Sequence, residues 1–171
     1  MDVLQKILNA ITTTNEGLFN IIVIPLTYLD AFVFMYFYTT VLNIKTTNKR
    51  KLIYVLIYGT FANLINFIVP ASYTVFINLI VWPVMVFFIL KTTVLKSILS
   101  EVITFVLTST LEFICSNVAF EFFNITMSQL MTVPLYRTLC VTSIYLLIYL
   151  ITLVIKYFKV NINVLDNMSK R

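Results

Sequence analysis

The chain has 171 residues, of which 60% are hydrophobic and 11% are charged, and it contains no histidine. Ordinary soluble domains are about 45–50% apolar and about 25% charged, so the composition excludes them and predicts one integral membrane domain of the all-α class. Without an imidazole the chain cannot build a histidine-dependent zinc site, a serine or cysteine protease triad, or a phospho-accepting histidine. We therefore expect no enzymatic activity, cofactor or metal.

The first apolar pattern predicts a helix that lies on the membrane surface. A secretory signal peptide is a poor interpretation, because the first long apolar run starts only near residue 18 and no small-residue cleavage site follows it. Residues 1–17 are instead predicted to form an interfacial amphipathic helix, with one apolar face at spacing i, i+3, i+4, i+7. That face consists of Leu4, Ile7, Leu8 and Ile11.

The positions of charged residues predict five membrane spans. The longest uncharged interval is 52–90, which as one helix would be about 58 Å long against a hydrocarbon core of about 30 Å. It must therefore fold back, and Pro70–Thr74 supplies the turn. The predicted spans are 18–44, 52–69, 74–90, 98–123 and 135–158, and 159–171 is predicted to be a cytoplasmic tail or linker.

The basic residues predict the orientation in the membrane, because Lys and Arg are retained on the cytoplasmic side. With the N-terminus outside, all of the 12 basic residues except Lys6 and Arg137 lie on the cytoplasmic side. We therefore expect a multi-pass cell-membrane protein with its N-terminus outside and its C-terminus in the cytoplasm. The net charge of +5 then reflects topology, and nucleic-acid binding need not be invoked.

Polar residues gather on the fourth predicted span and form a seam along one helical face. Two interpretations stay open: hydrogen bonding to neighbouring helices, or a ligand-sensing network that opens to the outer face. For the second, Arg137 is the candidate counter-charge, paired with either Glu112 or Glu121. The seam consists of Glu101, Thr104, Thr108 and Glu112.

Asp30 is alone in the first span. It is predicted either to pair with an asparagine of the second span, Asn63 or Asn66, or to take part in sensing. A proton-coupled transporter would place carboxylates in the same way. Cys115 and Cys140 are interpreted as small apolar fillers.

The pattern resembles the N-terminal membrane sensor region of Agr-type (GHKL-class) receptor histidine kinases of low-GC Gram-positive bacteria. The resemblance covers roughly residues 18–160. It is carried by the basic loop Lys45–Lys51, by Asn63-Leu-Ile-Asn66 before Pro70, by the loop Lys91–Lys96, and by the stretch from Leu111-Glu112-Phe113 to Val133-Pro-Leu-Tyr-Arg137.

The resemblance implies a quorum-sensing receptor of a two-component system, which binds an extracellular peptide and signals through its last span to a cytoplasmic kinase domain. It also implies a homodimer formed through or next to that domain. The chain itself ends at Arg171 without kinase motifs, so it is expected to be a sensor half, a truncated product or a standalone relative. The alternatives are a small substrate-binding transporter subunit, which would use Asp30, Glu101 and Glu112, and a structural membrane protein.

Overall fold

The computed structural model describes residues 16–69 and 71–158. Within these residues all regular secondary structure is helical, which confirms the predicted all-α class. The predicted tail and most of the predicted interfacial helix lie outside the described residues. The helices are α2 (Glu16–Val41), α3 (Asn48–Ile68), α4 (Ala71–Leu90), α5 (Val94–Phe123), α6 (Met127–Thr132) and α7 (Pro134–Tyr157).

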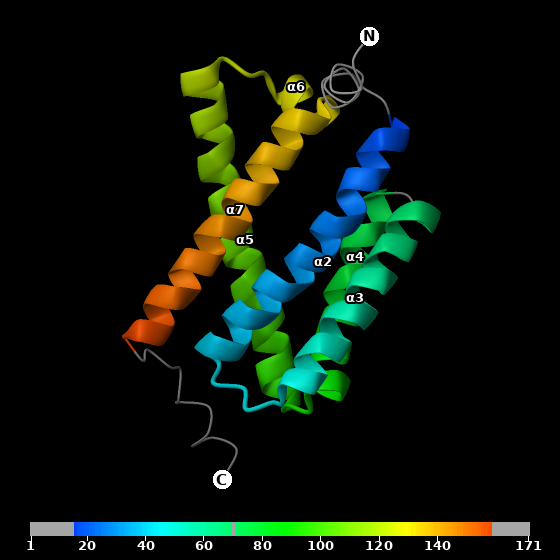
Figure 1. Ribbon diagram of the computed structural model, residues 1–171, viewed down its shortest axis with the longest axis vertical. Coiled ribbons are helices and arrows are strands. Elements are labelled where there is room, and N and C mark those ends of the chain that lie inside the picture. Colours follow the sequence, from blue (N-terminus) through cyan, green and yellow to red (C-terminus); the bar gives the residue numbers. More distant parts are fainter. Residues whose placement is uncertain (1–15, 70, 159–171) are drawn as a thin grey trace.

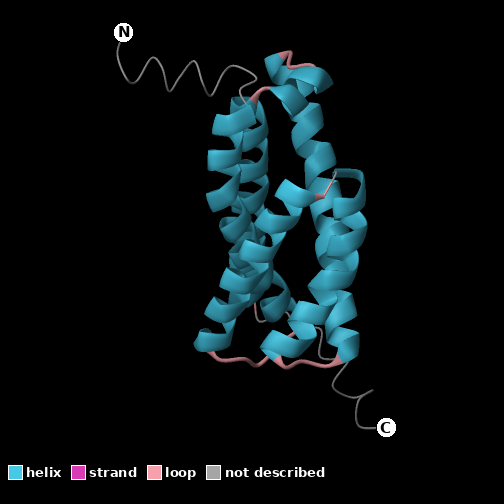
Figure 2. Cartoon of the chain, turned by 90° about the vertical axis from the view of Figure 1, so that its right-hand side faces the viewer, coloured by secondary structure: helices cyan, strands magenta, loops and turns pink. Residues whose placement is uncertain are grey.

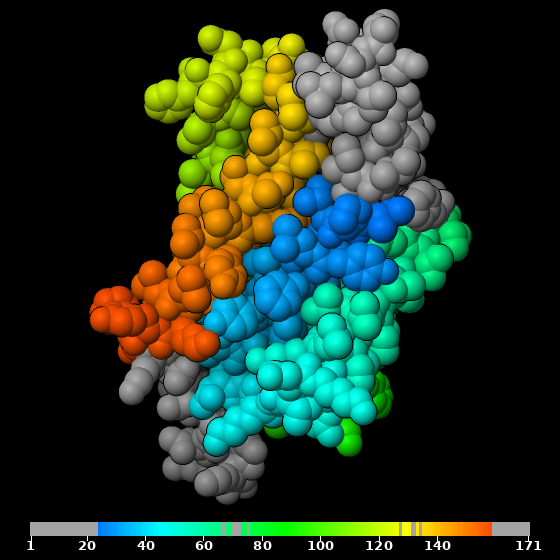
Figure 3. Space-filling view, in the orientation of Figure 1, coloured from blue at the N-terminus to red at the C-terminus, as the bar shows by residue number. Residues whose placement is uncertain are grey.

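The five long helices run up and down along the long axis, and their connections lie at the two ends (Figures 1 and 2). Each long helix packs against the next long helix in the chain: α2 against α3, α3 against α4, α4 against α5, and α5 against α7. The first and last of them also pack together, so α7 returns to α2 and closes the bundle. Figure 3 shows this return contact on one face, where α7 in orange lies along α2 in blue, with α3 on the other side of α2.

Polar residues in the connections end and start the helices. Asn43 and Lys91 have left-handed backbone conformations, with φ of 48° and 52°, which stop α2 and α4. The side chains of Thr47 and Thr93 then accept hydrogen bonds from the backbone N–H groups of the next helices, as N-cap residues do. α2 therefore ends at Val41, three residues before the end of the predicted first span.

Two details of the other end differ from the sequence interpretation. The predicted turn over residues 70–74 is shorter in the structure, because α4 already begins at Ala71. The short helix α6 was not predicted. Its N-terminus is a capping box, in which Thr126 and Gln129 each bind the other's backbone N–H.

An aromatic cluster forms the core between α2, α3 and α4. Trp82 is 5% exposed, and its ring centroid lies 4.8 Å from that of Tyr58, 5.7 Å from Phe34 and 6.1 Å from Tyr38. Trp82 therefore packs between the helices.

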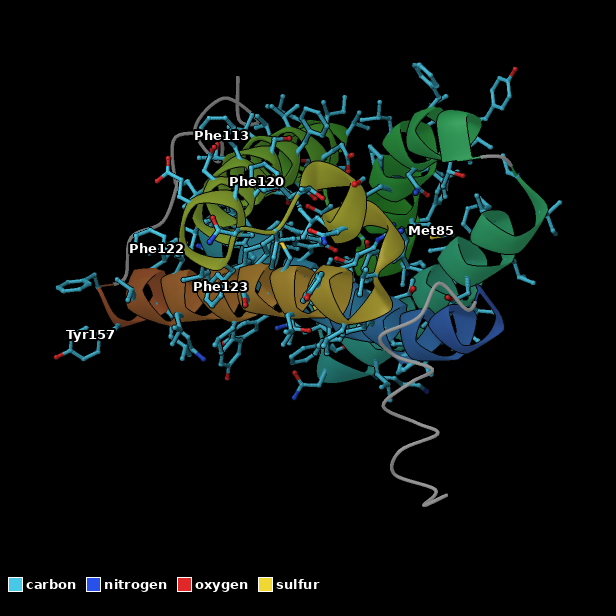
Figure 4. All side chains as sticks on the ribbon, turned by 90° about the horizontal axis from the view of Figure 1, so that it is seen from above. Met85, Phe113, Phe120, Phe122, Phe123 and Tyr157 are labelled. Carbon is cyan, nitrogen blue, oxygen red and sulfur yellow. The ribbon has the colours of Figure 1, made fainter. Side chains whose placement is uncertain are left out.

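Two of the described helices are long and apolar enough to cross a membrane, by length and composition alone: Val94–Phe123 and Leu135–Tyr157. Large apolar side chains also cover much of the outer surface of the bundle. Phe113 is 71% exposed and Tyr157 is 81% exposed, and the view along the bundle in Figure 4 shows both at the periphery.

Candidate functional site

A polar cavity between four helices brings together two of the residues singled out from the sequence, Asp30 and Arg137. Its volume is ≈ 210 Å³. We call it the Asp30 pocket. It is lined by Leu26, Thr27 and Asp30 of α2, Tyr58 and Ala62 of α3, Asn78 of α4, and Arg137, Thr138, Val141 and Tyr145 of α7.

Helical periodicity explains why these residues share one cavity. On α2 the lining positions include 26 and 30, on α3 they are 58 and 62, and on α7 they include 137, 141 and 145. Residues four apart lie above one another on one face of an α-helix. Each helix therefore turns a single stripe towards the cavity, and α2 and α7 supply most of it.

The carboxyl group of Asp30 lies close to the phenol of Tyr145, and the two side chains interact. This partner was not among those predicted for Asp30, which were Asn63 and Asn66. Glu112 of α5 lies close enough to Asp30 and Tyr145 to interact with both electrostatically. Two carboxyl groups and a phenol therefore lie near one another at this level of the bundle.

Asn63 instead joins α2 to α3 outside the cavity. Its amide nitrogen donates to the carbonyl oxygen of Gly59 at 2.9 Å and lies 3.5 Å from that of Ile24 on α2. One turn away, the hydroxyls of Tyr28 and Thr60 share a hydrogen bond of 2.9 Å between the same helices. The side chain of Asn66 lies outside the described residues.

Arg137 lines the same cavity as Asp30, an acidic residue that neither predicted pairing of Arg137 named. The sequence interpretation had considered Glu112 and Glu121 as its counter-charges. Neither glutamate lines the pocket, and both are exposed. No local pattern in the sequence predicts that Asp30 and Arg137 line one cavity, because their helices are the first and last of the five long helices described.

The four residues of the predicted seam on α5 differ in environment. Thr104 is buried, Glu101 and Thr108 are half-buried, and Glu112 is exposed. The hydroxyl of Thr108 donates to the carbonyl oxygen of Thr104 on the same helix at 2.7 Å. None of the four lines the Asp30 pocket, so the seam and the pocket are separate features.

A second cavity, of ≈ 530 Å³, lies between α5, α6 and α7 and has an almost entirely apolar lining. Cys115 of α5 and Cys140 of α7 both line it. Their thiols lie close to each other, and neither is in a disulfide. This apolar groove offers packing surface for hydrocarbon, whereas the Asp30 pocket offers polar recognition.

The part of the chain that the structure describes holds no cluster of three or more acidic or cysteine side chains arranged as metal ligands. Comparisons of the sequence with protein-family models and with curated proteins, and of the fold with solved structures, find no match. The functional argument therefore depends on the chemistry of the Asp30 pocket and on the surface of the bundle.

Proposed function

We propose that the chain is a multi-pass helical membrane protein with five spans, the N-terminal end of α2 outside and the C-terminal end of α7 in the cytoplasm. Besides the two helices already named, α2, α3 and α4 have 26, 21 and 20 residues. At a rise of 1.5 Å per residue these lengths match or exceed a hydrocarbon core of about 30 Å.

The distribution of basic residues supports this orientation. Among the described residues, Arg137 is near one end of the bundle, and all other Lys and Arg residues lie near the opposite end, the lower end in Figure 1. Such an asymmetry is typical of cytoplasmic loops. The residues at that end are Lys45, Lys49, Arg50, Lys51, Lys91, Lys96 and Lys156.

The outer surface supports a lipid environment. Phe76, Phe88, Phe105 and Phe122 are between 55% and 75% exposed. Soluble monomers rarely expose contiguous apolar patches of more than a few hundred Å². In a bilayer the same side chains contact lipid, and the exposure carries no penalty.

Within this framework we propose a receptor, in which the Asp30 pocket binds an extracellular signal molecule. The observation that carries this proposal is the meeting of Asp30 and Arg137 in one cavity, near the end of the bundle assigned to the outside. Charged groups at membrane depth are costly and usually functional. A peptide signal, suggested by the family resemblance, fits this proposal as one class of ligand.

Helix α7 supports a route for the signal. It lines the pocket with Arg137 and Tyr145 and continues to the opposite end. There Lys156 donates a hydrogen bond of 3.0 Å to the hydroxyl of Tyr36 on α2. A ligand that shifts α7 against α2 would move its cytoplasmic end, where a fused or partner kinase, and a homodimer formed through it, would respond.

A transporter subunit is the second candidate, because Asp30 is an acidic residue on a cavity wall within a proposed span. Uptake of the ligand distinguishes the two functions. A transporter accumulates a labelled ligand inside sealed vesicles that contain this chain, with or without a partner subunit, whereas a receptor binds it without net uptake.

Cysteine accessibility in intact cells tests the proposal. In a background with Cys115→Ser and Cys140→Ser, we expect Thr138→Cys to react with a membrane-impermeant maleimide added outside. The matched control Lys91→Cys, in the connection at the opposite end, should react only after the cells are permeabilised. Labelling of Lys91→Cys but not Thr138→Cys in intact cells would contradict the orientation.

A further inference from the structure

We propose that the Asp30 pocket binds a small zwitterion, with a primary ammonium group at Asp30 and Asn78 and an anionic group towards Arg137. The inference rests on the proposed role of the pocket as a ligand site and names the chemistry of the ligand. Two observations support it: the hydrogen-bond acceptors on the cavity wall, and the positions of the acidic and basic residues along that wall.

The first step concerns hydrogen-bond acceptors on the cavity wall, which require donors on the ligand. The side-chain oxygen of Asn78 is buried and has no hydrogen-bond partner among the described residues, and Asn78 lines the cavity. The carboxylate of Asp30 is a second acceptor on the same wall, and its two oxygens have lone pairs enough to accept from a ligand as well as from the nearby Tyr145. A ligand that satisfies both must bring donors, and an ammonium group brings three N–H groups.

The second step is the electrostatic character of the walls. The phenol rings of Tyr58 and Tyr145 line the cavity, and aromatic faces attract organic cations. Tyr58 is held in place by its neighbours, since its ring stacks on Tyr54 and lies 4.8 Å from that of Trp82. Glu112 adds negative potential close to Asp30. An anion at this level would meet two carboxylates, and a cation is favoured.

The third step is the opposite charge further along α7. Arg137 and Tyr145 are eight residues apart on this helix, or about 12 Å along its axis. A guanidinium group has five N–H donors, so Arg137 can bind a ligand carboxylate in addition to a partner within the chain. The cavity therefore presents an acid at one level and a base at another, and this order of charges is complementary to a zwitterion.

A divalent metal ion fits the same groups less well. Calcium takes six to eight oxygen ligands, usually with several carboxylates. The lining of the Asp30 pocket contains one carboxylate, that of Asp30, together with the cationic Arg137. The guanidinium would repel the metal ion, whereas it attracts the carboxylate of a zwitterion.

Titration calorimetry on the full chain in detergent micelles tests the proposal with four matched probes: β-alanine, n-propylamine, propionate and n-propanol. We expect β-alanine to bind most tightly and n-propylamine next. Propionate and n-propanol should bind at least about tenfold more weakly than β-alanine, since each lacks the charge-assisted bonds to Asp30.

Three variants sharpen the test. Asp30→Asn should weaken the binding of both β-alanine and n-propylamine by about tenfold or more. Arg137→Gln should weaken the binding of β-alanine and leave the affinity for n-propylamine unchanged. The control Glu101→Gln, on α5 and outside the cavity, should change neither of these two affinities.

Equal affinities for propionate and β-alanine, unchanged amine binding in Asp30→Asn, or no amine binding by the folded chain would each overturn the proposal. If Asp30→Asn does not fold, Asn78→Leu serves instead, because it removes the second acceptor with an apolar side chain of similar size. Amine binding and the accessibility of Thr138→Cys are separate measurements. Failure of the first leaves the membrane orientation standing, and failure of the second leaves the ligand chemistry standing.

Discussion

The ring of Tyr28 on α2 lies against Gly59 on α3 in the space that a Cβ atom at position 59 would occupy. The two helices can approach this closely because glycine has no side chain. The hydrogen bond between Tyr28 and Thr60 then fixes the ring beside the contact. This single position sets the distance between α2 and α3 next to the Asp30 pocket.

Gly59→Ala is expected to destabilise the bundle. In an unconstrained helix the change would stabilise by up to about 1 kcal/mol, but the overlap with Tyr28 is an overpacking that costs about 1–3 kcal/mol. The melting temperature in detergent should therefore fall. In the compensating double variant Gly59→Ala with Tyr28→Ala, the drop caused by the alanine at 59 should disappear. Equal drops in the presence and absence of the Tyr28 ring would show that the clash is not the cause.

Asn63→Ala is expected to loosen α2 from α3. The change removes the donor shared between the carbonyl groups of Gly59 and Ile24, and loss of a buried hydrogen bond costs about 1–3 kcal/mol. Asn117→Ala is the matched control, because Asn117 also bonds the carbonyl four residues earlier, that of Phe113, but within its own exposed helix face. Thermal unfolding should separate the two variants, and a similar loss in both would argue against a bridging role of Asn63.

Trp82→Ala is expected to be among the most damaging single changes in the bundle. The side chain is almost fully buried among three aromatic rings, and truncation of a buried tryptophan costs about 3–5 kcal/mol. Phe88→Ala, on the same helix but 68% exposed, serves as the comparison. Melting temperatures in one detergent give the ranking, and a larger loss for Phe88→Ala would contradict the assigned core.

Mild oxidation is expected to join α5 to α7 through Cys115 and Cys140. The two thiols face each other across the apolar groove. An added oxidant such as copper phenanthroline, which accepts the two electrons, would convert them into one disulfide within a chain. Intact mass spectrometry should show the loss of two hydrogen atoms and no maleimide labelling afterwards. Cys140→Ser is the control, and disulfide-linked dimers as the main product would contradict the contact.

Much of the fold was predictable from the sequence because charge and hydropathy vary along the chain with clear boundaries. The gap between Lys51 and Lys91 predicted two helices with a turn near Pro70, and the structure has them as α3 and α4. The short helix α6 was missed, although Thr126 and Gln129 have the spacing of a capping box, because the segment was read only as a loop.

The candidate site was less predictable, because a cavity depends on which helices become neighbours. Helical periodicity placed Glu101 and Glu112 on one stripe but could not say which side of α5 packs inward, and Glu112 is exposed. The partner of Asp30 was missed for a similar reason. Tyr145 lies on the last long helix, and no local pattern links it to the first.

The contact between α2 and α7 also bears on how the protein is made. Synthesis proceeds from the N-terminus, so Asp30 is made well before Tyr145 and Arg137 exist. Until then α3 and α4 flank the face of α2 that carries Asp30, but the wall supplied by α7 is missing. The bundle can close only when the last long helix has been made, so the Asp30 pocket is completed late in the assembly of the molecule.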